Sequence, residues 1–197
     1  MAYMPVSQDT TWQNSDELDL IETAVLVIDV LGGDTGLPAG FEEEAGKCVK
    51  LVKAARAKGL PVIFANDAHV PAYDRELELW GEHGIVGTQG GTPLDEFELT
   101  ESDIVIPKRR YDAFFGTDLD LTLRELGINT LIAVGCDANI CVLHTLAGAY
   151  MRGYRSVVCG DAVWTFLVGT LQGALEHYST CFDSRIVSTG HLLEKLA

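Results

Sequence analysis

The stretch that most constrains the fold is residues 130–142, which read TLIAVGCDANICV. Its first five residues form a short apolar run rich in β-branched side chains, typical of a strand that is buried on both faces. Gly135 ends this run, and from Val142 to Tyr150 apolar residues recur at helical spacing. The stretch therefore predicts a buried strand, a short turn and a helix, the unit from which parallel α/β sheets are built.

Cys141 falls in the turn of this unit, where the predicted helix begins. Backbone N–H groups in the first turn of a helix have no partner within the helix, and the helix dipole favours negative charge there. Both a thiolate and an oxyanion beside it would be stabilised, so the position suits a cysteine nucleophile. The alternative is a structural cysteine, since free cysteine is among the most buried residue types.

The rest of the chain repeats the alternation of strand and helix. Further strands are predicted at residues 23–30, 60–65, 103–107, 155–159 and 185–188, and helices at 41–58, 118–126, 168–181 and 191–197. Short crossovers between such elements predict a three-layer α/β/α, Rossmann-like fold with a six-stranded, mostly parallel sheet. We expect residues 1–22 to form an N-terminal extension and residues 23–197 a single domain. Residues 70–101 are a loop long enough to be functional.

The composition excludes some classes of partner. The formal charge is −15, which argues against nucleic acid and anionic membrane surfaces as partners. No apolar run reaches the length of a membrane span, and the first residues lack the basic and apolar regions of a signal peptide. The five cysteines form no CxxC pair. Reduced thiols and a cytoplasmic location are therefore the expectation.

Three predicted strands each deliver a polar side chain at their C-terminal ends. These side chains are Asp29, Lys108 and Cys141, and parallel strands bring such ends to one edge of the sheet. A lysine ammonium can lower the pKa of a neighbouring thiol. Asp29 can take the thiol proton and later return it to a leaving amine. The sequence thus predicts a cysteine hydrolase, although a loop or capping role is the simpler interpretation of Asp29 alone.

These residues resemble the isochorismatase-like cysteine hydrolases, which include nicotinamidase and N-carbamoylsarcosine amidase. The resemblance rests on the D-x-x-G sequence from Asp29, the lysine after the third predicted strand and GCDANICV before a helix, and it extends over the domain from Thr23 onward. It implies an Asp29–Lys108–Cys141 triad that attacks an amide carbon, releases ammonia or an amine and hydrolyses a thioester. It also implies a homo-oligomer, a dimer or a tetramer. NDAH and DRELELWGEH are closer to the N-carbamoylsarcosine-amidase-like branch than to nicotinamidases.

The resemblance further implies an oxyanion hole next to a non-proline cis peptide bond. That bond would join Cys136 to Asp137, and the N–H groups of Asp137 and Cys141 would be the donors. Many members have Ala-Thr where this chain has Asp137 and Ala138. The Asp137 carboxylate beside the oxyanion hole would then change which substrates the enzyme accepts.

A metal site is an open alternative. Asp67, His69 and His83 match three of four ligand positions in nicotinamidases, but Asp74 or Arg75 stands where the fourth ligand, a histidine, belongs. The missing ligand favours an enzyme that requires no cofactor, with His69 and His83 as hydrogen-bond partners of the substrate. The alternative is a zinc ion on the three residues present.

Other residues are candidates for the wall of a substrate pocket. Trp80 and Phe114 could form an apolar wall, although aromatic side chains more often fill a core. Arg109 could bind a substrate carboxylate through its planar guanidinium, although a surface charge is the simpler interpretation.

We therefore predict an amidohydrolase for a small carboxamide or ureido compound, N-carbamoylsarcosine-amidase-like, with nicotinamidase as the alternative. An isochorismatase, which cleaves a vinyl ether, is disfavoured because that branch lacks the nucleophilic cysteine. A binding protein without activity is disfavoured because all three triad positions are filled.

Overall fold

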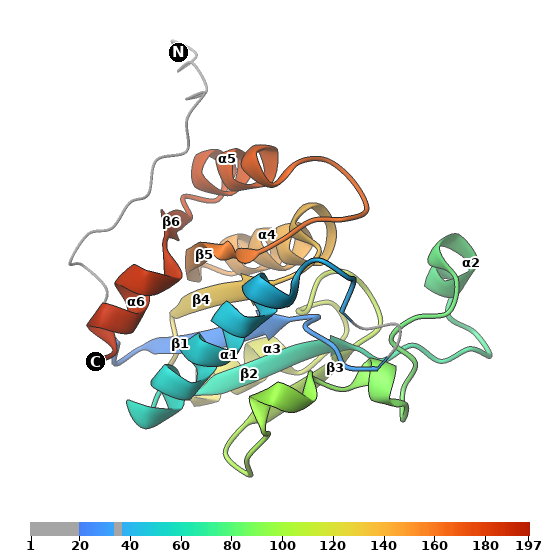
Figure 1. Cartoon of the computed structure of the whole chain (residues 1–197), viewed down its shortest axis with the longest axis horizontal. Helices are drawn as coiled ribbons and strands as arrows, with labels where there is room; N and C mark the ends of the chain where they lie inside the picture. The colour runs from blue at the N-terminus through green and yellow to red at the C-terminus, as the bar shows by residue number, and fades with distance from the viewer. Residues whose placement is uncertain (1–19, 34–36) are drawn as a thin grey trace.

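The computed structural model describes residues 20–33 and 37–197. The predicted N-terminal extension lies almost wholly outside these residues. The described chain forms one six-stranded sheet in the order β3-β2-β1-β4-β5-β6, and every neighbouring pair of strands is parallel (Figure 1). The strands are β1 (Thr23–Ile28), β2 (Val62–Asp67), β3 (Ile104–Lys108), β4 (Thr130–Gly135), β5 (Arg155–Val163) and β6 (Arg185–Val187).

Helices cover both faces of the sheet, which confirms the predicted three-layer α/β/α fold. One core packs the sheet against α1 (Glu42–Ala57) and α6 (Thr189–Lys195). The other core packs it against α3 (Leu119–Glu125), α4 (Leu143–Met151) and α5 (Leu171–Cys181). In Figure 1 the first pair lies in front of the sheet. None of the described helices is long and apolar enough to cross a membrane.

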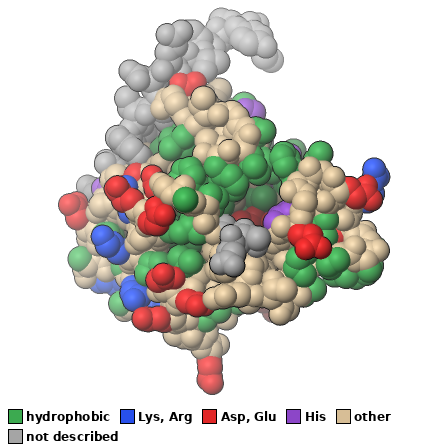
Figure 2. Space-filling view, turned by 45° about the vertical axis from the view of Figure 1, so that its right-hand side comes forward, with side chains coloured by type: hydrophobic (Ala, Val, Ile, Leu, Met, Phe, Trp, Pro, Cys, Tyr) green, Lys and Arg blue, Asp and Glu red, His purple; other side chains and the backbone are tan. Residues whose placement is uncertain are grey.

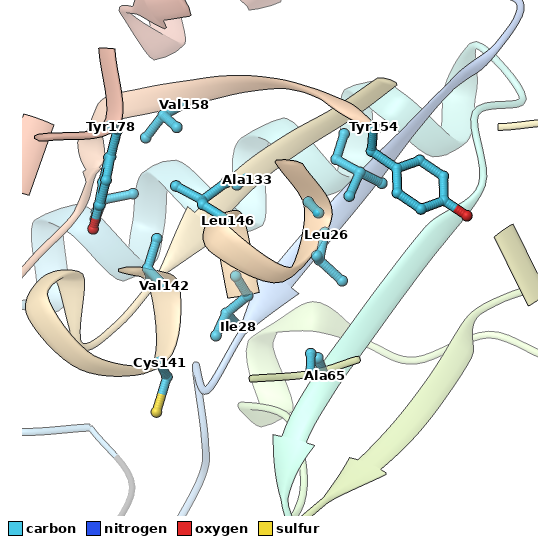
Figure 3. Packing of buried hydrophobic residues seen from close by; sticks show 14 of the residues in the cluster. Leu26, Ile28, Ala65, Ala133, Cys141, Val142, Leu146, Tyr154, Val158 and Tyr178 are labelled. Atoms are coloured by element: carbon cyan, nitrogen blue, oxygen red, sulfur yellow. The ribbon is translucent and has the colours of Figure 1, made fainter. Parts of the chain in front are cut away.

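After an initial threonine, the central strands β1 and β4 carry no polar side chain, because each contributes to both cores. In β1, Leu26 and Ile28 pack in the core beneath α4, whereas Val25 and Val27 pack in the core beneath α1. All six residues of β1 and of β4 are buried. Burial of apolar side chains at about 25 cal/mol per Å² makes these two cores the main source of stability. Figure 3 shows side chains from the core beneath α4.

The sheet order reverses between β1 and β4, the usual position of ligand sites in open α/β sheets. Gly135 ends β4 at φ +113°, and a Cβ at this position would lie 2.0 Å from the carbonyl oxygen of Ile28. Only glycine permits this close approach of the two strands. The C-terminal ends of β1 and β4 are thereby held next to each other.

The largest difference from the predicted elements lies in residues 70–101. The segment contains a short helix, α2 (Glu76–Trp80), and two 3₁₀ turns, η1 (Gln89–Gly91) and η2 (Asp95–Phe97). These pieces are too short to show a hydrophobic period in the sequence. Strand β5 also continues to Val163, four residues beyond the predicted end at Cys159.

Candidate active site

Asp29, Lys108 and Cys141 converge beyond the C-terminal ends of the strands. The Lys108 ammonium lies 2.7 Å from Asp29 Oδ2 and 3.6 Å from Cys141 Sγ. Asp29 follows β1 at φ +50°, and its other oxygen accepts the backbone N–H of Asp67 at 2.8 Å. All three side chains are buried. The structure thus brings together the three residues that the sequence predicted to lie at one edge of the sheet.

Cys141 lies in η3 (Ala138–Val142), a single π-helical turn that leads directly into α4. The Asp137 side chain caps this turn by accepting the backbone N–H of Asn139 at 2.8 Å. Figure 3 shows the Cys141 sulfur directed away from the packed side chains around Val142 and Leu146. The thiol therefore stands at the start of a helix and faces out of the core.

Burial and an excess of carboxylates set the protonation states of the three groups. Burial, and then the charge of Asp67, raise the pKa of Asp29 to about 6, although Lys108 acts to lower it. Burial acts to lower the pKa of Lys108, but Asp29 and Asp67 outweigh it and hold that pKa well above its ordinary value. At neutral pH, Asp29 is ionised yet basic enough to accept a proton.

The thiol of Cys141 behaves differently from the prediction. Burial raises its pKa well above the ordinary value, although Lys108 acts to lower it as expected. The desolvation of a buried thiolate outweighs one neighbouring ammonium. Cys141 is therefore a thiol before the substrate arrives, and a base must remove its proton during attack.

A cavity of about 190 Å³ opens over this cluster. Asp29, Asp67, Cys136 and Cys141 line its inner part. Its outer wall is largely apolar and aromatic, and includes Leu31, Pro38, Trp80, Tyr111, Ile140, Phe166 and Leu167. Figure 2 shows the hollow with acidic atoms inside it, a histidine at its edge and hydrophobic side chains around its rim. The cavity is large enough for a small molecule only.

Asp137 has two separate roles in the wall of this cavity. The peptide bond between Cys136 and Asp137 is cis, and the Asp137 N–H makes no hydrogen bond to the described part of the chain. The carboxylate accepts the backbone N–H groups of Phe166 at 2.9 Å and Leu167 at 3.1 Å, and the Thr165 hydroxyl at 2.9 Å. The acid thus anchors the loop that carries Phe166 and Leu167.

Asp67, His69 and His83 form a second cluster beside the first. One ligand atom from each lies within 4.8 Å of the others. The His69 ring is completely buried, and neither of its nitrogens has a hydrogen-bond partner among the described residues. Two imidazoles and a carboxylate fit a divalent cation such as zinc. Asp67 also binds the Lys108 ammonium, so the two clusters share one carboxylate.

The predicted pocket residues divide into three groups. Trp80 and His83 line the cavity. His69 lies behind it, with its ring edge-on to that of His83 at 4.7 Å between centroids. Arg109 and Phe114 do not line it. The Arg109 guanidinium is held by Asp74 at 2.9 Å, and Phe114 is buried against the ring of Tyr154. A strong ion pair and core packing explain these two positions.

Two cavity residues with polar side chains, Glu76 and Tyr111, were not predicted from the sequence. Glu76 begins α2 and is buried at the cavity wall, with Oε1 3.8 Å from His69 Nε2. The Tyr111 hydroxyl accepts a hydrogen bond from Trp80 Nε1 at 2.8 Å. The sequence signal for Glu76 is its spacing of four residues from Trp80, which places both on one face of a short helix.

The chain is similar to several known proteins. The isochorismatase domain model matches residues 23–189. A Bacillus subtilis isochorismatase family protein of uncharacterised function, PncA, is 36% identical over 160 residues, covering 77% of this chain and 86% of that protein. The ureidoacrylate amidohydrolase RutB of Pseudomonas savastanoi is 34% identical over 172 residues, covering 72% of this chain and 70% of that protein.

Two solved structures share the fold at similar identity. The N-carbamoylsarcosine amidase of Thermoplasma acidophilum has a TM-score of 0.78 at 32% identity, covering 85% of this chain and 96% of that one. The nicotinamidase PncA of Bacillus subtilis has a TM-score of 0.76 at 30% identity, covering 85% of this chain and 99% of that one. The parallel sheet, the position of the cavity and these matches together show that the chain belongs to the isochorismatase family of hydrolases.

Proposed function

We propose that the protein is a cysteine-dependent amidohydrolase that cleaves a C–N bond of a small amide or ureido compound through a thioester. The observation that carries this proposal is the contact of Lys108 with both Asp29 and Cys141 at the inner end of a small cavity. The relatives named as amidases and as a ureidoacrylate amidohydrolase support C–N hydrolysis as the reaction class.

The first half-reaction transfers the acyl group to sulfur. Asp29 takes the proton of the Cys141 thiol while the sulfur attacks the carbonyl carbon, and the carbonyl electrons move to oxygen. The N–H groups of Asp137 and Cys141 are the proposed donors to this oxyanion. As the oxyanion collapses, the C–N bond breaks and Asp29 returns its proton to the leaving nitrogen. Ammonia or an amine departs and a thioester remains on Cys141.

The second half-reaction restores the enzyme. Asp29 takes a proton from a water molecule while the water oxygen attacks the thioester carbon. The C–S bond then breaks, the acid product departs and Cys141 regains its proton. Lys108 remains an ammonium throughout because Asp29 and Asp67 hold its pKa high. Its role is to orient Asp29 and to balance the negative charge that develops on sulfur.

The chemistry of the triad requires no metal. Asp67, His69 and His83 are the residues that would hold a divalent cation, which would polarise or orient the substrate. Because Lys108 and Asp29 already supply the charge and the base, the cation would contribute mainly to binding.

The test is a screen for ammonia release. Nicotinamide, N-carbamoylsarcosine and ureidoacrylate represent the named relatives, and Cys141→Ala is the control for contaminating activity. The proposal expects at least one small amide or ureido compound to be hydrolysed by the wild type and not by Cys141→Ala. Equal rates of hydrolysis in the two proteins would refute a cysteine mechanism, and no hydrolysis of any of these compounds would favour a binding protein.

A further inference from the structure

Among the described residues, the cavity wall carries acids but no Lys or Arg side chain. All 14 Lys and Arg residues of the sequence lie in the part that the structure describes, and none of them is among the described residues lining the cavity. Lys108 contacts three lining residues, but its ammonium is already bound to Asp29 and Asp67. A substrate carboxylate would therefore find no unpaired Lys or Arg side chain inside the cavity.

The nearest arginines are engaged elsewhere. Asp74 binds the guanidinium of Arg109 at 2.9 Å and that of Arg110 at 3.3 Å. Arg75 and Arg110 line a separate outer depression, which shares only Glu76 and Tyr111 with the cavity. The predicted role of Arg109 in binding a substrate carboxylate is therefore not supported by its position.

Helix α2 presents a carboxylate and an indole to the cavity. Glu76 is only 9% exposed and Trp80 lies one turn later, and both line the cavity. Trp80 is fixed by its hydrogen bond to the Tyr111 hydroxyl at 2.8 Å. This wall combines a flat apolar surface with one buried carboxylate. It suits a planar substrate that offers an N–H group or a positive charge to Glu76.

A carboxylate in the same place would be disfavoured for two reasons. It would lose its hydration without gaining an ion pair with a lysine or an arginine, which is costly for a charged group. It would also face Glu76, Asp67 and Asp29 at short range, where like charges repel strongly in a partly desolvated cavity. An uncharged amide of the same shape meets neither penalty.

We propose that Glu76 is a specificity residue that restricts the enzyme to uncharged or cationic amides and excludes substrates that carry a carboxylate. The proposal rests on the proposed amidohydrolase function and narrows its substrate class. N-carbamoylsarcosine and ureidoacrylate, both carboxylates, are then poor substrates. Planar neutral amides such as nicotinamide and benzamide belong to the favoured class.

Matched pairs of compounds test this directly. Benzamide is compared with 3-carboxybenzamide, and N-carbamoylsarcosine with its own carboxamide. Binding to Cys141→Ala is measured by calorimetry, and turnover is measured with the wild type. We expect the uncharged member of each pair to bind about tenfold more tightly than the carboxylate member, or better, because one charge repulsion is left uncompensated. Glu76→Gln should reduce this ratio of neutral to carboxylate affinity, and the matching ratio of turnover, by about tenfold.

Glu78→Gln is the matched control, because Glu78 is an exposed acid on the same helix that lines only the outer depression. It should leave the ratio unchanged. Carboxylate members that bind as well as their neutral partners, or a ratio unaffected by Glu76→Gln, would overturn the proposal. A carboxylate preference that is lost in Arg75→Ala or Arg110→Ala would overturn it in favour of the outer arginines. Binding to Cys141→Ala requires no catalysis, so its outcome is independent of whether the thioester mechanism is right.

Discussion

The Lys108 ammonium forms an ion pair with Asp29 Oδ2 at 2.7 Å while its side chain is completely buried. The same ammonium also binds Asp67, so one cation serves two carboxylates. The cluster of Asp29, Asp67 and Lys108 therefore carries a net negative charge and is shielded from water. Burial first, and then the negative charge of Asp67, raise the pKa of Asp29 to about 6 despite its lysine partner.

Activity should fall at acidic pH as Asp29 becomes protonated. Because its pKa is raised to about 6, the base is present above that pH and is lost below it. We expect kcat/KM to decline below about pH 6, and Asp29→Asn to abolish turnover. Asp67→Asn removes a neighbouring negative charge, so it should move the acid limb to lower pH. If kcat/KM declined at the same pH in Asp67→Asn as in the wild type, the charge of Asp67 would not contribute to the raised pKa of Asp29.

Replacing Lys108 should damage both stability and activity. Lys108→Met leaves two buried carboxylates without their cation, a change that typically costs about 3–5 kcal/mol. Turnover should fall by about a thousandfold or more, because the members of a triad act as a unit. Lys53→Met is the control, since Lys53 is half exposed and its pair with Glu98 at 3.3 Å is worth about 1 kcal/mol or less. Denaturation with urea and steady-state kinetics measure the two effects.

The Asp137 carboxylate should control substrate binding through the loop at residues 165–167. Asp137→Asn weakens the contacts to Phe166 and Leu167, so these two wall residues lose their anchor. We expect KM to rise by about tenfold, while kcat changes less, because charge-assisted hydrogen bonds contribute about 1.5–3 kcal/mol. Asp161→Asn is the control, because Asp161 binds the backbone N–H of Thr189 at 2.7 Å and does not line the cavity. A rise in KM of the same size in the control would contradict the assignment.

Metal removal should leave the chemical step intact. The sulfur, the base and the ammonium all come from the triad, so treatment with dipicolinate should leave kcat within about twofold. Any effect of chelation should appear in KM, and His83→Ala should reproduce it. Elemental analysis before and after treatment accompanies the kinetics. A large loss of kcat that added zinc restores would show that the metal takes part in the chemistry.

The parts of the site that the sequence predicted are those set by regular structure. Asp29 and Lys108 could be placed because parallel strands end at one edge of a sheet. Cys141 could be placed because a glycine-ended strand and a helix enclose it.

What the sequence did not reveal depends on contacts between distant segments. Glu76 lines the cavity because of where α2 lies within the long connection at residues 70–101. Hydrophobic periodicity in the sequence does not predict the path of that connection. Asp137 anchors the loop at 165–167, which lies almost thirty residues away in the sequence. The high pKa of Cys141 follows from burial, which a charge count cannot estimate. The expected homo-oligomer remains a prediction, and light scattering should give a mass well above the 21.4 kDa of one chain.

The most direct test of the thioester mechanism is the mass of the protein during turnover. Wild type mixed with a reactive small amide and quenched in acid should gain the mass of the acyl group, and peptide mapping should place it on Cys141. Cys141→Ala should gain nothing and release no ammonia. Ammonia release by Cys141→Ala at the wild-type rate, or an acyl group on another residue, would contradict the mechanism.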